Sequence, residues 1–380
     1  MKEVGFLVAG VVLGGFVSLV LTVRFEDRWK ARLRRRGNAR LAGAVRRMRA
    51  EADGPVHVAG FATSVYLVEG DGELVLEPED IRIRLRGGRA ELPGDVVSLR
   101  DRVVKELRAA RRASVGVAPS WDSRSLVALR GYRIARAGVR EDARITLDVT
   151  RVDYATFAAT VLRLDAEFEW NGVPTTLRRA YLQAPTLERR AVAQPVPFLA
   201  NGVGIALVAF TDDDRLLLAR RRVNTSARGG ERDVGVVEGM HADLDLAARG
   251  GGLNPYETAV RGCREELGVN VEPADVRLLG FAVDMAYYQW NFVGFVELRK
   301  TSDEVLEAQR LHAKDRWEAK LEPVAIDPEV VFTRIRHDGM WDMGLVATYL
   351  ALCTRCGVGA VARAAERVLG SRPARPPWRR

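Results

Sequence analysis

The longest apolar stretch of the chain lies at its N-terminus. Residues 4–23 form an uncharged run of about 20 residues. An α-helix rises 1.5 Å per residue, so about 20 apolar residues cross a hydrocarbon core of roughly 30 Å. A cleaved signal peptide would need a more basic start and a small-residue cleavage site, which this sequence lacks. The pattern therefore predicts a single transmembrane anchor over residues 1–24.

Basic residues follow this stretch and predict its orientation. Seven of them stand just after the run, against Lys2 before it: Arg24, Arg28, Lys30, Arg32, Arg34, Arg35 and Arg36. Positive charge stays on the cytoplasmic side, so we expect a single-pass membrane protein with a cytoplasmic C-terminal body. Residues 25–54 alternate basic and apolar positions as a surface-lying amphipathic helix does, and would bind anionic lipid. Gly10 and Gly14 are spaced for helix packing and suggest a homodimer.

The middle of the chain, residues 55–195, mixes strand and helix patterns. Strands are expected at residues 64–69, 81–85, 145–149 and 166–170, and a helix at 99–112. Gly-rich turns separate these elements. A few residues here either line a pocket or serve as caps, turns and packing: Trp121, Asp122, Asp153, Tyr154 and Asp165. The pattern predicts a mixed α/β region but not its role.

A second pattern begins near Asn201 and predicts a further domain over residues 200–368. An apolar run at 203–210 and a shorter one at 215–219 flank an acidic turn, as in a β-hairpin. A short strand is expected at 234–237, followed by longer strands at 276–285 and 290–298. The last third reads as helices at 303–311, 328–337 and 341–356, and residues 369–380 as a disordered basic tail.

Composition narrows the class of protein. Of the 380 residues, 47% are hydrophobic and 29% charged, which suits packed domains rather than disorder. The net charge of +9 is concentrated beside the expected anchor and at the C-terminus, so we read it as a membrane-facing feature and expect no nucleic-acid binding. Three cysteines make no disulfide framework and suggest a reducing compartment. The Ala-, Arg- and Gly-rich bias is typical of a bacterium, which would place the chain in a plasma membrane.

One helix carries candidate chemistry. Pro255 opens it with Asn254 as the N-cap, and Gly268 follows its end. Glu257, Arg261 and Glu265 are spaced four apart and form one stripe along the helix, with Glu266 beside the last of them. A carboxylate pair at a helix end suits a hard divalent cation, which completes its shell with phosphate oxygens and water.

This segment resembles the Nudix family. A hairpin, a Gly-rich loop, a helix reading R-x-x-x-E-E-L-G-V and two strands together cover about residues 201–298. By position, Arg261 matches the arginine of the Nudix box, and Glu265 and Glu266 match its metal-binding pair. The resemblance implies an α/β/α sandwich around a mixed sheet. It also implies hydrolysis, with Mg²⁺ or Mn²⁺, of a nucleoside diphosphate linked to another group.

The match is incomplete in the first half of the box. The glutamate that follows the arginine in the family, a metal ligand and often the catalytic base, is Gly262 here. Leu253 and Ala247 fall where an upstream glutamate and the box glycine are expected, so Gly239 is a candidate for that glycine. Another acid would have to serve as base, and Glu238 or Glu257 are the first candidates, with Asp243 and Asp245 in the loop as others.

Further side chains are candidates for substrate contacts. Arg220 and Arg221 end the second hairpin strand, and their guanidinium groups would suit a phosphate as well as open solvent. Tyr287, Tyr288 and Trp290 would stack on a base or pack against the sheet.

Together these observations predict an α+β protein with a single N-terminal transmembrane helix, a mixed α/β middle region and a C-terminal Nudix-like sandwich. The first hypothesis for its function is Mg²⁺-dependent hydrolysis of a nucleotide or related diphosphate ligand. The alternative is a Nudix-like sensor or scaffold that has lost catalysis and only binds such a ligand.

Overall fold

The computed structural model describes residues 54–70, 75–88, 91–113, 125–137, 142–223, 228–247 and 252–370. The elements that we expected at residues 1–24 and 25–53, the Gly10/Gly14 pair and the tail from residue 371 lie outside these described residues, as do Trp121 and Asp122.

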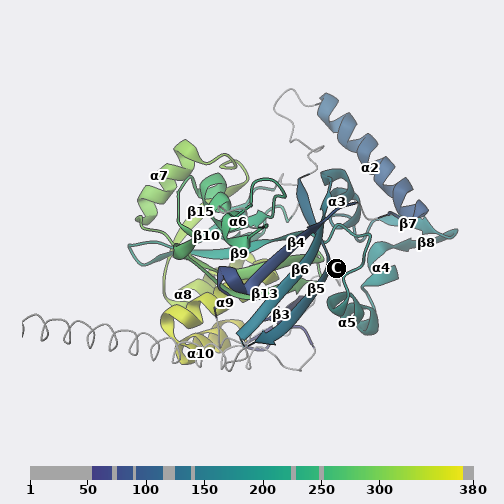
Figure 1. Cartoon of the computed structure of the whole chain (residues 1–380). Coiled ribbons are helices and arrows are strands. Elements are labelled where there is room, and N and C mark those ends of the chain that lie inside the picture. The colour runs from purple at the N-terminus through teal and green to yellow at the C-terminus, as the bar shows by residue number, and fades with distance from the viewer. Residues whose placement is uncertain are drawn as a thin grey trace, which may run out of the picture.

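A mixed sheet forms the centre of the fold, which is α+β as predicted (Figure 1). Its described strands are, in spatial order, β11 (Arg232–Val234), β10 (Arg215–Arg221), β9 (Val203–Phe210), β14 (Gln289–Glu297), β13 (Val276–Asp284) and β3 (Val65–Glu69). Two more strands extend it, β12 (Val236–Gly239) beside β9 and β15 (Ala319–Ala325) beside β10. The β9 and β14 strands run parallel, whereas the other pairs are antiparallel.

The β9 strand is central because apolar side chains cover both of its faces. Ile205 and Leu207 pack into one hydrophobic core, and Val208 and Phe210 pack into a second core on the other face. A strand buried on both faces reads as a continuous apolar run, which is how its sequence predicted it. The bounds predicted for this strand are confirmed.

Helices cover the two faces of the sheet. Figure 1 shows α6 and α7 on one side and α8, α9 and α10 gathered on the other. Their bounds are α6 (Pro255–Gly262), α7 (Ser302–His312), α8 (Pro328–Asp338), α9 (Asp342–Cys356) and α10 (Val358–Leu369). The helices predicted at 303–311, 328–337 and 341–356 are therefore confirmed to within about two residues at each end.

The middle of the chain adds small sheets and helices. The described strands are β1 (His57–Val58), β2 (Phe61–Ala62), β4 (Ile81–Arg86), β5 (Leu126–Ala137), β6 (Asp142–Val152), β7 (Glu167–Trp170) and β8 (Val173–Thr176). The helices are α2 (Gly94–Ala113), α3 (Tyr154–Thr160), α4 (Leu177–Tyr181) and α5 (Pro185–Ala193). Strands β4, β6 and β5 form a three-stranded sheet that shares a hydrophobic core with α6.

The middle region does not stand apart from the rest. Its β3 strand pairs with β13 of the central sheet, and a β-bridge joins Ala128 of β5 to Gly202 just before β9. Backbone pairing thus connects the two regions on either side of the boundary that we expected near residue 200. It places the middle region close to the loops around α6.

The prediction of a single-pass membrane protein is corrected. Among the described residues, no helix is both long enough and apolar enough to cross a bilayer, and the expected segment lies outside them. The apolar α9 has 15 residues, about 22 Å at 1.5 Å per residue, and packs inside the fold. The α2 helix has 20 residues but carries charges along its length. Neither the membrane location nor the cytoplasmic orientation derived from that anchor has support in the structure.

A buried acidic network holds β3, β13 and α9 together. The Ser64 hydroxyl lies 2.5 Å from an oxygen of Asp284 and 2.9 Å from one of Asp342, and Trp341 Nε1 donates to Asp284 at 2.5 Å. Ser64 N also donates to the same oxygen of Asp342 at 2.7 Å, so Asp342 accepts from the backbone while the hydroxyl of Ser64 is shared between the two carboxylates. Burial and the nearby charge of Asp284 raise the pKa of Asp342 from 3.8 to about 6.

This shift predicts a pH-dependent stability. Folding raises the pKa of Asp342, so its contribution is fully present below its unfolded pKa of 3.8 and is lost as the pH rises through about 6. We expect wild-type protein to lose on the order of 2 kcal/mol of unfolding free energy between about pH 4 and pH 6 relative to Asp342→Asn, whose amide does not titrate. Urea unfolding of both proteins across this range measures the difference, and parallel pH profiles would contradict it.

Candidate metal-binding site

The helix that carries the candidate chemistry is fixed at both ends. Asn254 caps it, since its side chain accepts a hydrogen bond from Tyr256 N at 2.9 Å, and Pro255 occupies the first turn. At the other end, Gly268 adopts φ 69°, and a Cβ there would lie 2.4 Å from the carbonyl oxygen of Ala308. These caps are the ones that the sequence predicted.

The last turn of this helix is not the regular α-helix that we predicted. The sequence suggested a regular α-helix to Leu267, but Cys263–Leu267 forms a π-helical turn. Such turns are rare and frequently mark functional sites, because the wider winding changes the direction in which side chains project. Here the turn contains both Glu265 and Glu266, so it sets where these two carboxylates point.

Arg261 is the centre of the site and is almost completely buried. Its Nε and Nη2 contact the two carboxylate oxygens of Asp245 at 2.7 and 3.0 Å. Its Nη1 lies 3.1 Å from Glu238 and 3.2 Å from Glu265, and Nη2 also donates to the carbonyl of Gly239 at 2.6 Å. One planar guanidinium thus holds a strand end, a loop and the π-helical turn in fixed relation.

Three carboxylates converge next to this arginine. Glu238 is the second-last residue of β12, Glu265 lies on the π-helical turn and Asp315 follows α7. One oxygen from each lies within 4.8 Å of the others. Around Mg²⁺, ligand oxygens at about 2.1 Å would be roughly 3 to 4 Å apart, so small side-chain movements would fit the three to a cation. The residue types, all hard oxygen donors, also suit Mg²⁺ or Mn²⁺.

The charge in this cluster is only partly balanced. Burial raises the pKa of Glu238 to about 7, opposed by Arg261 and reinforced by the nearby Glu265 and Asp315. Burial also raises the pKa of Asp315. Arg261 and the exposed Lys314, whose Nζ is 3.3 Å from Glu265, supply the positive charge nearby. A carboxylate with a pKa near neutrality can take up and release a proton under physiological conditions.

Glu266 takes a different position from its neighbour. Both of its carboxylate oxygens accept from Val237 N at 3.3 Å, and burial raises its pKa well above the ordinary value. It faces a recess of about 10 Å³, room for about one water, that Arg221 and Asp315 also line. Glu266 is therefore near the cluster but not one of the three converging carboxylates, and its assignment as a metal ligand stays a prediction.

Gly262 explains why Glu238 reaches this position. A Cβ added at Gly262 would lie 2.9 Å from Val236 Cγ1 and 3.0 Å from Glu238 Cβ. The side chain of Glu238 therefore occupies the space next to the helix where a side chain at position 262 would begin. A carboxylate from the neighbouring strand thus packs against the helix at the position where the resemblance led us to expect a glutamate.

The remaining candidates are distributed around this cluster. The side chain of Glu257, one turn before Arg261, makes no hydrogen bond or ion pair with other described residues, so the structure does not bring it into the cluster. Arg221 lines the small recess and pairs with Glu318 at 3.3 Å. Arg220, the next residue back along β10, pairs instead with Asp338 at the end of α8.

The structure also decides the role of two aromatic candidates and adds one acidic residue to the site. Tyr288 and Trp290 are fully buried, which confirms packing rather than base stacking for them. Asp315 was missed by the sequence analysis. It stands in a polar loop with no motif, and only the pairing of β15 with β10 and the bond from Asp315 N to Glu265 O, at 3.0 Å, bring it to the cluster.

Comparisons with known proteins add little to this geometry. No protein-family model matches the chain, and no curated protein is similar to it. Among solved structures, the crystal structure of DR0079 from Deinococcus radiodurans is similar at 18% identity, covering 39% of this chain and 80% of that one, with a TM-score of 0.26. A similarity of this extent carries no argument about fold or function, so the resemblance to the Nudix family stays a prediction.

Removal of Arg261 should destabilise the protein strongly. Asp245 is completely buried, and Arg261→Met would leave its charge without a cationic partner, with only the hydrogen bonds from His241 N and the Thr258 hydroxyl. We expect a loss of about 3–5 kcal/mol in the free energy of unfolding, measured by urea denaturation. Arg264→Met, on the exposed face of the same segment, is the matched control and should stay within about 0.5 kcal/mol of wild type. Similar losses in both variants would contradict a structural role specific to Arg261.

Proposed function

We propose that the protein is a Mg²⁺-dependent hydrolase of compounds in which a nucleoside diphosphate is linked to another group. The observation that supports this is the convergence of Glu238, Glu265 and Asp315 to within 4.8 Å beside a buried arginine. Two hard-oxygen ligands, Glu265 and Asp315, would leave coordination positions open for phosphate and water on Mg²⁺, with the Glu238 carboxylate beside them. The order of hairpin, loop and R-x-x-x-E-E-L-G helix supplies the class of substrate by resemblance.

The residues divide into distinct roles under this proposal. Glu265 and Asp315 hold the cation, which when bound polarises the phosphoryl group and acidifies a water molecule. Glu238 accepts the proton of the attacking water as the P–O bond to the leaving group breaks. Its pKa of about 7 suits a general base at neutral pH. Arg261 is a positioning residue, since it contacts both Glu238 and Glu265.

A second function is favoured by the ion pairs of the cluster. Arg261 contacts Glu238 and Glu265, and Lys314 contacts Glu265, so two of the three carboxylates have cationic partners within the chain. These cationic partners lessen the need of the two carboxylates for a metal ion. The corresponding alternative is a protein that binds a nucleotide or diphosphate ligand as a sensor or scaffold and does not hydrolyse it.

The test is turnover by the full chain. The protein is incubated with Mg²⁺ or Mn²⁺ and a panel of nucleoside diphosphate compounds that includes ADP-ribose, and release of a nucleoside monophosphate is followed. Glu238→Gln should lower the rate by about 10²–10⁴ because the proton acceptor is lost. Glu257→Gln, on the same helix as Arg261 but outside the cluster, should leave the rate within about twofold.

The outcomes separate the two functions. Metal-dependent product release that Glu238→Gln loses and Glu257→Gln keeps supports the hydrolase. Absence of turnover across the panel, with a rise in melting temperature on addition of one of the compounds, supports the sensor and excludes the proposed mechanism.

Moving the carboxylate tests whether Glu238 replaces the missing box glutamate. Gly262→Glu alone should be inactive and less stable, since its Cβ would start 3.0 Å from that of Glu238. The double variant Glu238→Gly/Gly262→Glu removes the close contact with Glu238, keeps the one at 2.9 Å with Val236 Cγ1, and returns a carboxylate to the helix. We expect it to recover at least about tenfold of the rate lost in Glu238→Gly. Equal rates for Glu238→Gly and the double variant would show that the two positions are not interchangeable.

A further inference from the structure

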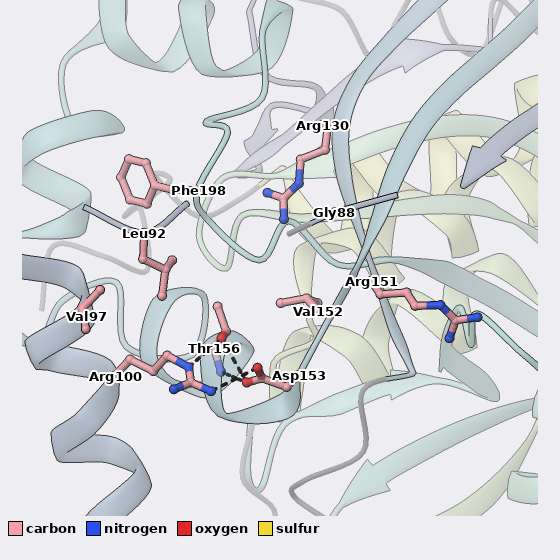
Figure 2. Close-up of a pocket in the computed structure, with 10 residues that line it drawn as sticks. All are labelled: Gly88, Leu92, Val97, Arg100, Arg130, Arg151, Val152, Asp153, Thr156 and Phe198. Atoms are coloured by element: carbon pink, nitrogen blue, oxygen red, sulfur yellow. Dashed lines mark hydrogen bonds and ion pairs between the residues drawn. The ribbon is translucent and has the colours of Figure 1, made fainter. Parts of the chain in front are cut away.

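A larger pocket lies apart from the acidic cluster, in the middle region of the chain. It has a volume of about 580 Å³, within the usual range for small-molecule sites. Figure 2 shows its walls, formed by α2, by β5 and β6, by the start of α3 and by the segment that leads into β9. None of the residues that line it belongs to the acidic cluster described above.

Two of the three arginines in this pocket already have acidic partners. Arg100 donates to Asp153 at 3.1 Å and to Thr156 at 2.9 Å. Asp153 also caps α3, so it fills both of the roles left open for it by the sequence. Arg151 forms a two-pronged ion pair with Asp243, with Nη1 at 2.9 Å and Nη2 at 2.5 Å.

Arg130 differs from both, because its hydrogen-bond partners are neutral. Its Nε donates to Thr150 at 2.7 Å, and its Nη1 donates to the carbonyls of Pro197 and Leu199, the second at 2.9 Å. Among the described residues, no carboxylate pairs with it and its Nη2 has no hydrogen bond. Figure 2 shows the guanidinium pointing into the pocket.

The carboxylates that the structure describes at this pocket are paired with Arg100 and Arg151, and none of them pairs with Arg130. Burial of Arg130 lowers its pKa to about 10, so it remains charged at neutral pH in a partly desolvated position. A charge in such surroundings is unfavourable unless a counter-charge is close, and an arginine offers paired N–H donors that fit a phosphate or a carboxylate. The pocket therefore has a position for an anion at Arg130.

The other wall of the pocket is apolar. Leu92, Val97, Val152 and Phe198 line it, and Phe198 is held edge-on against Tyr181 at a centroid distance of 5.0 Å. Apolar side chains around one charged group are the usual composition of a site for a small molecule with an anionic end and an apolar body.

From this geometry we infer that the pocket is a binding site for a small organic anion, with its phosphate or carboxylate on Arg130 and its apolar part against Phe198 and Leu92. The site is separate from the proposed metal centre. The loop after β12 contacts both, because Asp243 pairs with Arg151 of the pocket wall and Asp245 pairs with Arg261 of the cluster.

Binding of phenyl phosphate to the full chain, measured by isothermal titration calorimetry with EDTA present, tests the inference. Phenyl phosphate carries both required parts, and we expect saturable binding with a dissociation constant of about 1 mM or lower. Inorganic phosphate, which has no apolar part, and phenol, which has no anion, should each bind at least about tenfold more weakly. Benzoate serves as the carboxylate counterpart, and the tighter of the two probes identifies the preferred anionic group.

Variants distinguish this pocket from other sites. Arg130→Met should weaken phenyl phosphate binding by about tenfold or more, whereas Arg133→Met, exposed on the same strand, should not change it. Val97→Trp is a second variant that leaves Arg130 and its hydrogen bonds intact. Val97 is 40% exposed on α2 and lines the pocket, so a larger side chain there is expected to block the site without unfolding the protein.

Two results of these titrations would contradict an anion site at Arg130. No saturation by either phenyl phosphate or benzoate up to about 10 mM, or binding that survives both Arg130→Met and Val97→Trp, excludes an anion site in this pocket. Loss of binding in Glu238→Gln instead would assign the anion to the acidic cluster and also exclude it.

Discussion

The ion pair between Arg261 and Asp245 is the interaction on which the site depends. Asp245 is completely buried and Arg261 nearly so, and burying two charges is unfavourable unless both are paired with good geometry. The two-pronged contact meets that condition and fixes the guanidinium. Once fixed, the same group contacts Glu238, Glu265 and the carbonyl of Gly239, so strand, loop and π-helical turn take their positions from one side chain.

The carboxylates around Arg261 are held in an electrostatically unfavourable arrangement. Glu238, Glu265 and Asp315 lie closer together than like charges favour, and burial and mutual repulsion raise the pKa values of Glu238 and Asp315. A group of carboxylates held under such repulsion gains most from a cation or a proton. This physical logic is the same whether the site performs hydrolysis or only binds a ligand, because in both cases the counter-charge completes it.

The middle region has a closer relation to this site than its sequence suggested. Strand β3 belongs to the central sheet, and the loop after β12 contacts Arg151 of β6 as well as Arg261. One short loop therefore contacts both the acidic cluster and the pocket, in which Arg130 has no acidic partner among the described residues.

The sequence by itself determined the local elements of this protein. The continuous apolar run of β9, the Asn254 cap, the Gly268 end and the stripe of Arg261 and Glu265 were predicted from patterns within a few residues, because strand and helix periodicity and capping are local properties of the backbone. It predicted Glu238 only as one of several possible acids, and it missed the π-helical turn. The tertiary structure alone decided that Glu238 fills the space at Gly262, that Asp315 joins from beyond α7, and that Arg130 faces a pocket with no acidic partner in the described part of the chain. Each of these depends on packing between segments far apart in the chain, and residue spacing along one segment carries no information about which distant segment will lie against it.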